Sequence, residues 1–249
     1  MVDTTVSSPS ILIFIGITAA YSIMQYLFES TGMRLAVTLI YFLVVLVVQY
    51  FLNLNVAKNL CGTPQYGTAI LVTAVPWFVI FGILKAVLTV FPGWLSPFSN
   101  TIGYGVSRLA GVRSTLEQIV KSPGKTSKKS NGPLDHIYND PSLLINEITP
   151  ANFDTFWSTM KQGGLLLDGA ANHMAEMRKL VRLKDIVSEF IWFVITGSLV
   201  SSVSFNYMIN TACSKSADDI KKNVAKLDAD RKAASKKSKQ PQKVYTTRE

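Results

Sequence analysis

Residues 35–54 read LAVTLIYFLVVLVVQYFLNL, and this stretch decides the class of fold. None of its side chains is charged at neutral pH. An α-helix rises about 1.5 Å per residue and the hydrocarbon layer of a bilayer is about 30 Å thick, so roughly 20 apolar residues are enough to cross it. The stretch therefore predicts a transmembrane helix.

Three further stretches are also long and apolar enough to cross a bilayer. Residues 11–28 carry no charge, residues 68–91 contain only Lys85, and residues 186–209 contain only Glu189. The first stretch is not typical of a cleavable signal peptide, because the residues before it lack a basic leader. The sequence predicts an all-α, multi-pass helical membrane protein with about four transmembrane helices.

Composition agrees with this class. Hydrophobic residues make up 48% of the 249 residues and charged residues only 16%, against about 25% charged in ordinary soluble domains. Mean hydropathy is +0.26. The formal charge is +9, and 22 of the 25 Lys and Arg residues lie either between residues 93 and 185 or beyond residue 213. Apart from Lys85, the basic charge thus lies outside the predicted spans.

These boundaries divide the chain into five regions. They are an N-terminal tail (1–10), three transmembrane helices (11–91), an extramembrane region (92–185), a fourth transmembrane helix (186–211) and a basic tail (212–249). Four spans place both termini on one side and the extramembrane region on the other. By the positive-inside rule, the charges of the short loops favour cytoplasmic termini. The preference is weak, because the extramembrane region and the tail are both basic.

Three residues in or near the spans have two interpretations each. Lys85 lies six residues from Phe91, so it either snorkels to the interface or acts as a buried functional charge. Glu189 is expected to be an interfacial carboxylate near Lys184 or Arg182, with an intramembrane pair to Lys85 as the alternative. Pro76 is expected to kink the third span rather than end it.

The extramembrane region opens with aromatic residues among Pro and Gly, which is typical of a rigid turn in the headgroup layer. From Tyr104 to Val120 apolar residues recur every three or four positions and predict one amphipathic helix. This helix would lie on a membrane or pack against protein. Thr149 and Pro150 predict another helix start, with Trp157 on its apolar face. A long helix is expected to run from Leu165 into the fourth span.

Two basic segments lack anchoring apolar residues. Residues 121–133 form a Ser, Pro and Gly-rich linker containing Lys128 and Lys129, and its Gly-Lys-Thr triplet does not complete a phosphate-binding loop. The tail contains Lys236 and Lys237, and residues 216–234 are compatible with a charged helix. The tail is suited to anionic lipid headgroups, nucleic acid phosphates or an acidic protein surface.

The sequence gives no positive support for an enzyme. No catalytic arrangement of Ser, His, Cys or paired carboxylates is evident, and we predict no cofactor. His136 and His173 are expected to be structural or solvated, and two cysteines with two histidines are too few for a typical zinc site. A Cys61–Cys213 disulfide is topologically possible, but a reducing compartment would prevent it.

Residues 61–104 contain a PW-bearing span followed by FPGW and PFSNTIGYG. In these features the chain resembles membrane proteins of nucleocytoplasmic large DNA viruses of the algal-virus type, over roughly a fifth of its length. The resemblance implies a virion component in the internal lipid membrane beneath an icosahedral capsid, of the minor-capsid kind, with no active site. It is carried by Pro76, Trp77, Phe91, Pro92, Gly93, Trp94, Pro97, Phe98, Ser99, Asn100, Gly103 and Tyr104.

We therefore expect a structural virion protein that links the internal membrane to the overlying capsid. Its expected partners are the lipid bilayer, major and other minor capsid proteins, and anionic headgroups or nucleic acid at the tail, with many copies in each particle. Its expected locations are the virion internal membrane and, during assembly, a host membrane derived from the endoplasmic reticulum. The alternative is a small transporter or channel subunit. The candidate capsid or membrane contacts are Phe91, Trp94, Phe98, Tyr104, Lys128, Lys129, Trp157, Lys236 and Lys237.

Overall fold

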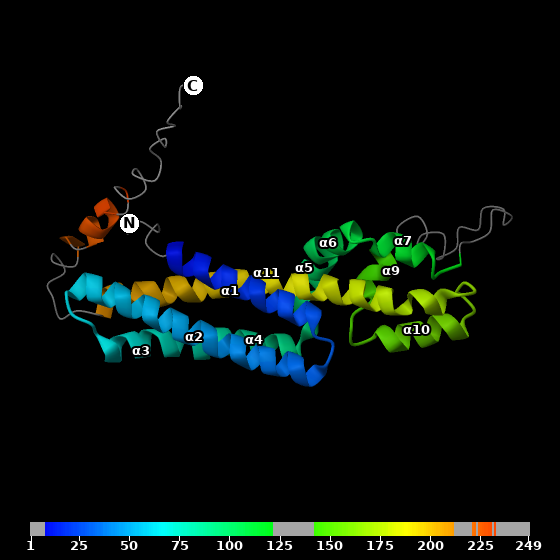
Figure 1. Cartoon of the computed structure of the whole chain (residues 1–249), viewed down its shortest axis with the longest axis horizontal. Helices are drawn as coiled ribbons and strands as arrows, with labels where there is room; N and C mark the ends of the chain where they lie inside the picture. Colours follow the sequence, from blue (N-terminus) through cyan, green and yellow to red (C-terminus); the bar gives the residue numbers. More distant parts are fainter. Residues whose placement is uncertain (1–7, 122–141, 212–220, 223, 231, 233–249) are drawn as a thin grey trace, which may run out of the picture. The chain divides into compact units, whose positions relative to one another are not determined.

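The computed structural model describes residues 8–121, 142–211, 221–222, 224–230 and 232. Within these ranges every regular element is a helix, apart from an isolated bridge between Val120 and Leu166 (Figure 1). The predicted all-α class is confirmed.

Four helical rods are long and apolar enough to cross a membrane. The first two are α1 (Ser8–Leu27) and α2 (Thr31–Cys61). The third is continuous through α3 (Tyr66–Val75), the π-helical segment η2 (Pro76–Phe81) and α4 (Gly82–Val90). The fourth is α11 (Met174–Thr211). The chain is therefore a multi-pass helical membrane protein. As predicted, the third rod continues through Pro76, here by a local widening of the helix.

The outer faces of these rods are apolar. Leu39, Leu43 and Leu71 are each more than 60% exposed although they lie within spans. Rows of large aliphatic side chains of this kind are costly in water and favourable against lipid chains. Lipid is therefore the solvent that this surface fits.

The chain divides into two compact units. Unit 1 contains the described parts of Met1–Ile13, Leu43–Phe81 and Leu199–Glu249, and unit 2 contains Phe14–Phe42 and Gly82–Ser198. The long helices pass from one unit into the other.

In unit 1, apolar and polar contacts hold the helices together. Its core contains Leu60 of α2, Val72 of α3 and Met208 of α11, and Val224 and Leu227 from the start of the basic tail pack against it. Buried Asn53 of α2 donates a 2.8 Å hydrogen bond to Thr73 of α3. The amide and hydroxyl satisfy each other where no water is available.

In unit 2, α1 and α2 form an antiparallel hairpin joined by polar pairs. The Thr18 hydroxyl lies 3.1 Å from that of Tyr41, and the Tyr21 hydroxyl lies 3.3 Å from that of Thr38. The partners in each pair are equally far from the turn, as the antiparallel arrangement requires. The rings of Tyr21 and Tyr41 stack on Phe193 of α11, so three spans meet at this point.

The extramembrane part of unit 2 has its own apolar core. It is formed by α7 (Val112–Glu117), α9 (Ser142–Glu147), α10 (Phe153–Gln162) and the first half of α11. The fully or almost fully buried side chains include Ile119, Ile145, Phe153, Met177 and Val181. The core is therefore built directly on the helix that continues into the fourth span.

A line of small residues brings the segment after the third span against α11. This segment comprises η3 (Pro92–Leu95), α5 (Ser96–Phe98), η4 (Ser99–Gly103) and α6 (Tyr104–Leu109). Ser99 and Ser107 donate to the Asp185 carboxylate and the Leu180 carbonyl at 3.1 and 3.0 Å. Gly103 lies between them, so close that an added Cβ would be 2.4 Å from the Lys184 carbonyl oxygen. Spacing of small residues by four positions permits this close helix approach.

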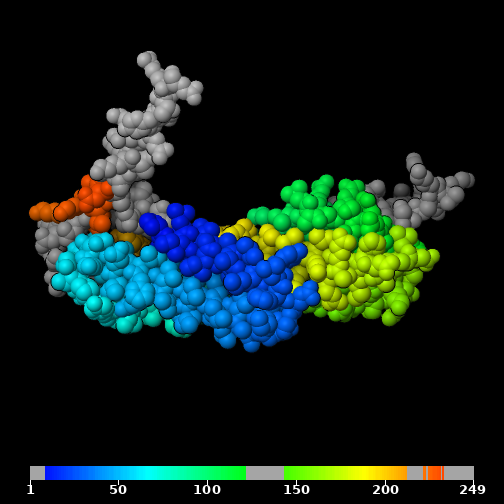
Figure 2. All heavy atoms as spheres, viewed as in Figure 1, coloured from blue at the N-terminus to red at the C-terminus, as the bar shows by residue number. Residues whose placement is uncertain are grey.

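The prediction of a single amphipathic helix from Tyr104 to Val120 is wrong. The helix is broken at Gly111, whose φ of +104° is left-handed, and α6 and α7 are separate helices (Figure 1). Atoms of this part of the chain, green in Figure 2, lie at the surface. The two parts also differ in burial, because Leu109 is 91% exposed whereas Val112 is fully buried. A spacing pattern does not reveal a break at a glycine.

Two other helix starts differ from the predictions. The α10 helix begins at Phe153 rather than Thr149. Thr149 and Asn152 lie in a turn before it, in which the side-chain oxygen of each residue accepts a hydrogen bond from the backbone N–H of the other. The long helix begins after Gly169, at the 3₁₀ turn η5 (Ala170–His173), rather than at Leu165. Gly169 has a φ of +86°, which ends the preceding turn. The predicted passage of this helix into the fourth span is confirmed.

Several predictions lie outside the described residues. They concern the linker beyond Lys121, His136, the far end of the tail and the Cys61–Cys213 pairing, since Cys213 is not described. They stay predictions.

Candidate functional site

A charged pocket lies in unit 2 where the second, third and fourth spans reach the membrane boundary. Its volume is about 290 Å³. Three cations and two carboxylates line it, with apolar residues and a turn between them. The lining residues are Arg34, Lys85, Leu88, Thr89, Leu95, Pro150, Ala151, Arg182, Asp185, Ile186 and Glu189.

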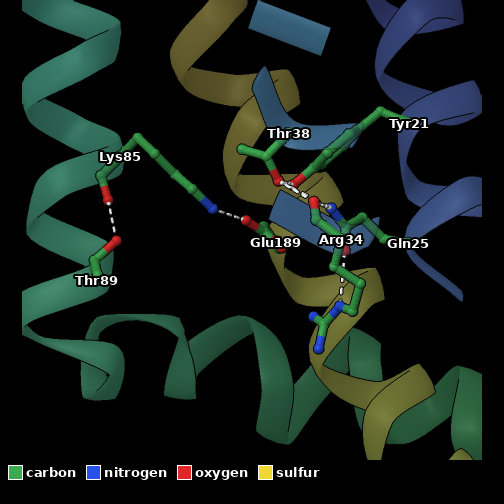
Figure 3. A network of polar contacts seen from close by, with 7 residues as sticks. All are labelled: Tyr21, Gln25, Arg34, Thr38, Lys85, Thr89 and Glu189. Carbon is green, nitrogen blue, oxygen red and sulfur yellow. Dashed lines mark hydrogen bonds and ion pairs between the residues drawn. The ribbon is translucent and has the colours of Figure 1, made fainter. Parts of the chain in front are cut away.

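Lys85 and Glu189 form an ion pair between α4 and α11 in this pocket. Figure 3 shows the Lys85 side chain extending from one helix toward the carboxylate on the other. The ammonium group also lies 5.0 Å from the centre of the Phe193 ring. Both side chains are partly exposed, at 27% and 18%. The ion-pair partner of Glu189 is therefore Lys85, which was the alternative interpretation, and not Lys184 or Arg182.

The Arg34 guanidinium lies at the start of the second span and is held by α1. Its Nε donates a 2.8 Å hydrogen bond to the Gln25 side-chain carbonyl. The Gln25 amide donates in turn to the Arg34 backbone carbonyl and to the Thr38 hydroxyl, each at 3.0 Å (Figure 3). The glutamine thus fixes the arginine side chain and joins α1 to the start of α2.

Arg182 approaches the same region from α11. It donates to the backbone carbonyls of Gln25 and Phe28 at the end of α1. Helix-end carbonyls have no partner within their own helix, and a basic side chain is a favourable one. Arg182 Nε is buried and has no hydrogen-bond partner within the described ranges.

Lys184 lies beside the pocket but serves a different purpose. It is fully buried, and its ammonium donates to the carbonyls of Ile145 and Ile148 at 2.8 and 2.9 Å. These carbonyls belong to the last turn of α9 and the residue following it. A buried charge requires such partners. Nothing in the sequence pattern identified this partner, because α9 lies 36 or more residues away along the chain.

The aromatic contact candidates gather around the boundary. Phe91 and Trp94 stack with ring centres 6.4 Å apart, and both are more than half exposed. Trp94 and Phe98 each contact Trp192 of α11 edge-on, at 6.5 and 6.0 Å. Trp192 was not among the candidates, although its place in the fourth span, near the boundary, is typical of the aromatic belt.

The other candidates have different settings. Tyr104 packs against the extramembrane core. Trp157 is only 9% exposed and belongs to that core, so most of its surface is used within the chain. Lys128, Lys129, Lys236 and Lys237 lie outside the described residues.

Among the described residues no group of three or more His, Cys, Asp or Glu is arranged to hold a metal ion. His173 lies 3.8 Å from Glu176, one turn along the same helical stretch.

Comparisons with protein-family models, curated proteins and solved structures find no match to this chain.

Proposed function

We propose that this protein is a structural virion component that anchors in an internal lipid membrane and links it to an overlying icosahedral capsid. The observation that carries the proposal is the continuity of α11. Its 38 residues correspond to about 57 Å, and only about 30 Å of helix is needed to cross the hydrocarbon layer. The remaining half is the central helix of the extramembrane core.

This continuity suits a mechanical link. Force on the extramembrane core is transmitted to a membrane span through unbroken backbone hydrogen bonds rather than through a flexible connection. The small-residue contacts of Ser99, Gly103 and Ser107 tie the end of the third span to the same helix. Weak contacts made by many copies then hold the shell through avidity.

The most direct test is a cryo-electron-microscopy map of purified particles. We expect a rod of helical density that runs from the lipid layer into a small helical domain beneath the shell. If the protein instead resides in membranes of uninfected cells, the virion role is wrong although the four spans are unaffected.

Cross-linking of intact particles tests which side faces the shell. Four spans place Lys128 and Lys129 on the opposite side from Lys236 and Lys237. We propose that the extramembrane region faces the shell, so the first lysine pair should cross-link to capsid proteins and the second should not. Capsid cross-links from both pairs would contradict the topology.

A transporter or channel subunit is the second candidate, because the Lys85–Glu189 pair lines a pocket among the spans. Replacing both residues with leucine removes the charges together and leaves neither unpaired. A structural protein should still be incorporated into particles with this double variant. A transport protein should lose ion or solute flux in proteoliposomes.

A further inference from the structure

We propose that the pocket of unit 2 binds a phosphate group, as carried by the headgroup of an anionic phospholipid, between Arg34 and Arg182. The proposal does not depend on a virion role. It concerns a binding site that the sequence did not indicate.

The charge of the pocket is the first argument. Three cations and two carboxylates line the pocket, so cations are in excess by one. Lys85 is paired with Glu189, and the Asp185 carboxylate accepts a hydrogen bond from the neutral Ser99 hydroxyl. This leaves Arg34 and Arg182, neither of which forms an ion pair with a carboxylate in the described part of the chain. The two guanidinium groups also repel each other electrostatically. An anion between them would relieve that repulsion.

Donor geometry is the second argument. Arg34 uses its Nε on Gln25, so its two terminal nitrogens have no recorded partner within the described ranges. Arg182 uses Nη2 on the end of α1. Each guanidinium therefore retains N–H groups, and guanidinium groups recognise phosphate oxygens through paired hydrogen bonds. Both side chains are held in place by α1, so little freedom is lost on binding.

Depth and size favour a lipid headgroup. Arg34 immediately precedes the apolar run of α2, and Arg182 lies one turn before the predicted start of the fourth span. Lipid phosphates lie at this boundary, and basic residues there attract anionic lipids. Leu88, Leu95 and Ile186 line the same pocket and offer an apolar surface to the glycerol and upper acyl chain. A volume of about 290 Å³ is at the small end for ligand sites and suits a headgroup.

Native mass spectrometry of the full chain tests this proposal. The protein is reconstituted in nanodiscs of phosphatidylcholine with a minor fraction of phosphatidic acid and then released. We expect retention of phosphatidic acid over phosphatidylcholine, and a roughly tenfold or greater loss of retention in Arg34→Gln and Arg182→Gln, as follows from losing charge-assisted hydrogen bonds. The control Arg113→Gln removes an exposed arginine outside the pocket, which pairs with Glu117, and should retain the lipid.

Arg182→Gln also removes the contacts to α1, so Arg34→Gln decides the outcome if the other variant fails to fold. Competition with inorganic phosphate distinguishes the sources of the phosphate group. If inorganic phosphate displaces the lipid, the site recognises the phosphate alone, and if it does not, the lipid portion contributes. Equal retention by the parent, Arg34→Gln and Arg113→Gln would overturn the proposal.

Discussion

Lys184 is a fully buried lysine whose ammonium donates hydrogen bonds to backbone carbonyls at the end of a short helix and in the turn that follows it. A six-residue helix such as α9 has little stability of its own. The ammonium group supplies the partners that its terminal carbonyls lack. One side chain of the long helix thus holds a distant segment in place.

Replacing Lys184 with methionine keeps the length of the side chain and removes its donors. The carbonyls of Ile145 and Ile148 would be left without this partner, and each unsatisfied buried group costs about 1–3 kcal/mol. We expect a clear loss of thermal stability in detergent, followed by tryptophan fluorescence. Lys179→Met is the control, because Lys179 is 60% exposed and lies 3.7 Å from Glu29, and it should be nearly neutral. Equal effects from the two variants would contradict the assigned role.

Gly103 is a second residue on which the packing depends. An added Cβ would lie 2.4 Å from the Lys184 carbonyl oxygen and 2.7 Å from the Ser188 hydroxyl. Gly103→Ala must therefore push η4 away from α11, and overpacking of this kind costs about 1–3 kcal/mol.

The matched control for this prediction is Gly105→Ala, two residues along the same segment. An added Cβ at Gly105 meets no atom within 4 Å, so this variant should be neutral or slightly stabilising. Melting temperatures of the two variants, measured side by side, check the prediction. It is wrong if Gly103→Ala is tolerated as well as Gly105→Ala.

Polar side chains inside the spans join neighbouring helices. The Asn53–Thr73 hydrogen bond joins α2 to α3 in a buried setting. A double-mutant cycle with Asn53→Leu and Thr73→Val should give a coupling of about 0.6 kcal/mol, the usual size for such pairs within membranes. The exposed Thr63–Gln65 pair, changed to Val and Met, should show almost none. A coupling near zero for the first pair would mean that this hydrogen bond does not help to join the two helices.

The ion pair between Asp154 of α10 and Arg178 of α11 predicts a pH-dependent contact between these helices. Arg178 donates two hydrogen bonds to Asp154, which lowers the pKa of this carboxyl below its usual value. Since the folded-state pKa lies below the unfolded one, the pair contributes stability above the usual Asp pKa and loses that contribution as the pH falls through the folded value.

This pH dependence can be measured by comparing the parent protein with Asp154→Asn. The difference in melting temperature should be present at neutral pH, should shrink below about pH 4, and should be small because both groups are exposed. Arg178→Gln should remove the same pH dependence. A difference that stays constant down to pH 3 would contradict the assignment.

The elements also show which parts of the fold were predictable. The four spans followed from length and hydropathy, because lipid requires every backbone group to be satisfied within the helix and so leaves few options. The break at Gly111 was not predictable, because the apolar spacing continues across it. The Lys184 contacts could not be assigned, since their partners are brought together only by tertiary packing. The Lys85–Glu189 pair was only the alternative interpretation of Glu189, because the sequence does not show which helices are neighbours.

The same limit applies to the site. The aromatic residues at the boundary were identified because Trp and Phe beside a span are typical of the headgroup layer. The pocket itself was missed because Arg34 and Arg182 lie far apart in the sequence and each looks like an ordinary flanking charge. The prediction of Trp157 as a capsid or membrane contact rests on its place on an apolar helix face, and the same spacing fits the core that it occupies.

The surfaces of the four helical rods fit lipid rather than water as their surroundings. Their exposed faces carry large aliphatic residues, and between 22% and 39% of the residues in each span's most apolar window are buried within the chain. A soluble protein with this surface would aggregate. The polar pairs, in contrast, point between helices, as they must in a medium without water.

Alkaline carbonate extraction of membranes containing the full chain tests this claim most directly. Carbonate releases proteins that are held only by surface charge, including any held through the basic tail, but leaves spanning helices in the bilayer. We predict that all of the intact chain stays with the membrane pellet and is released only by detergent. Recovery of the intact chain in the carbonate supernatant would contradict the membrane-spanning fold and everything inferred from it.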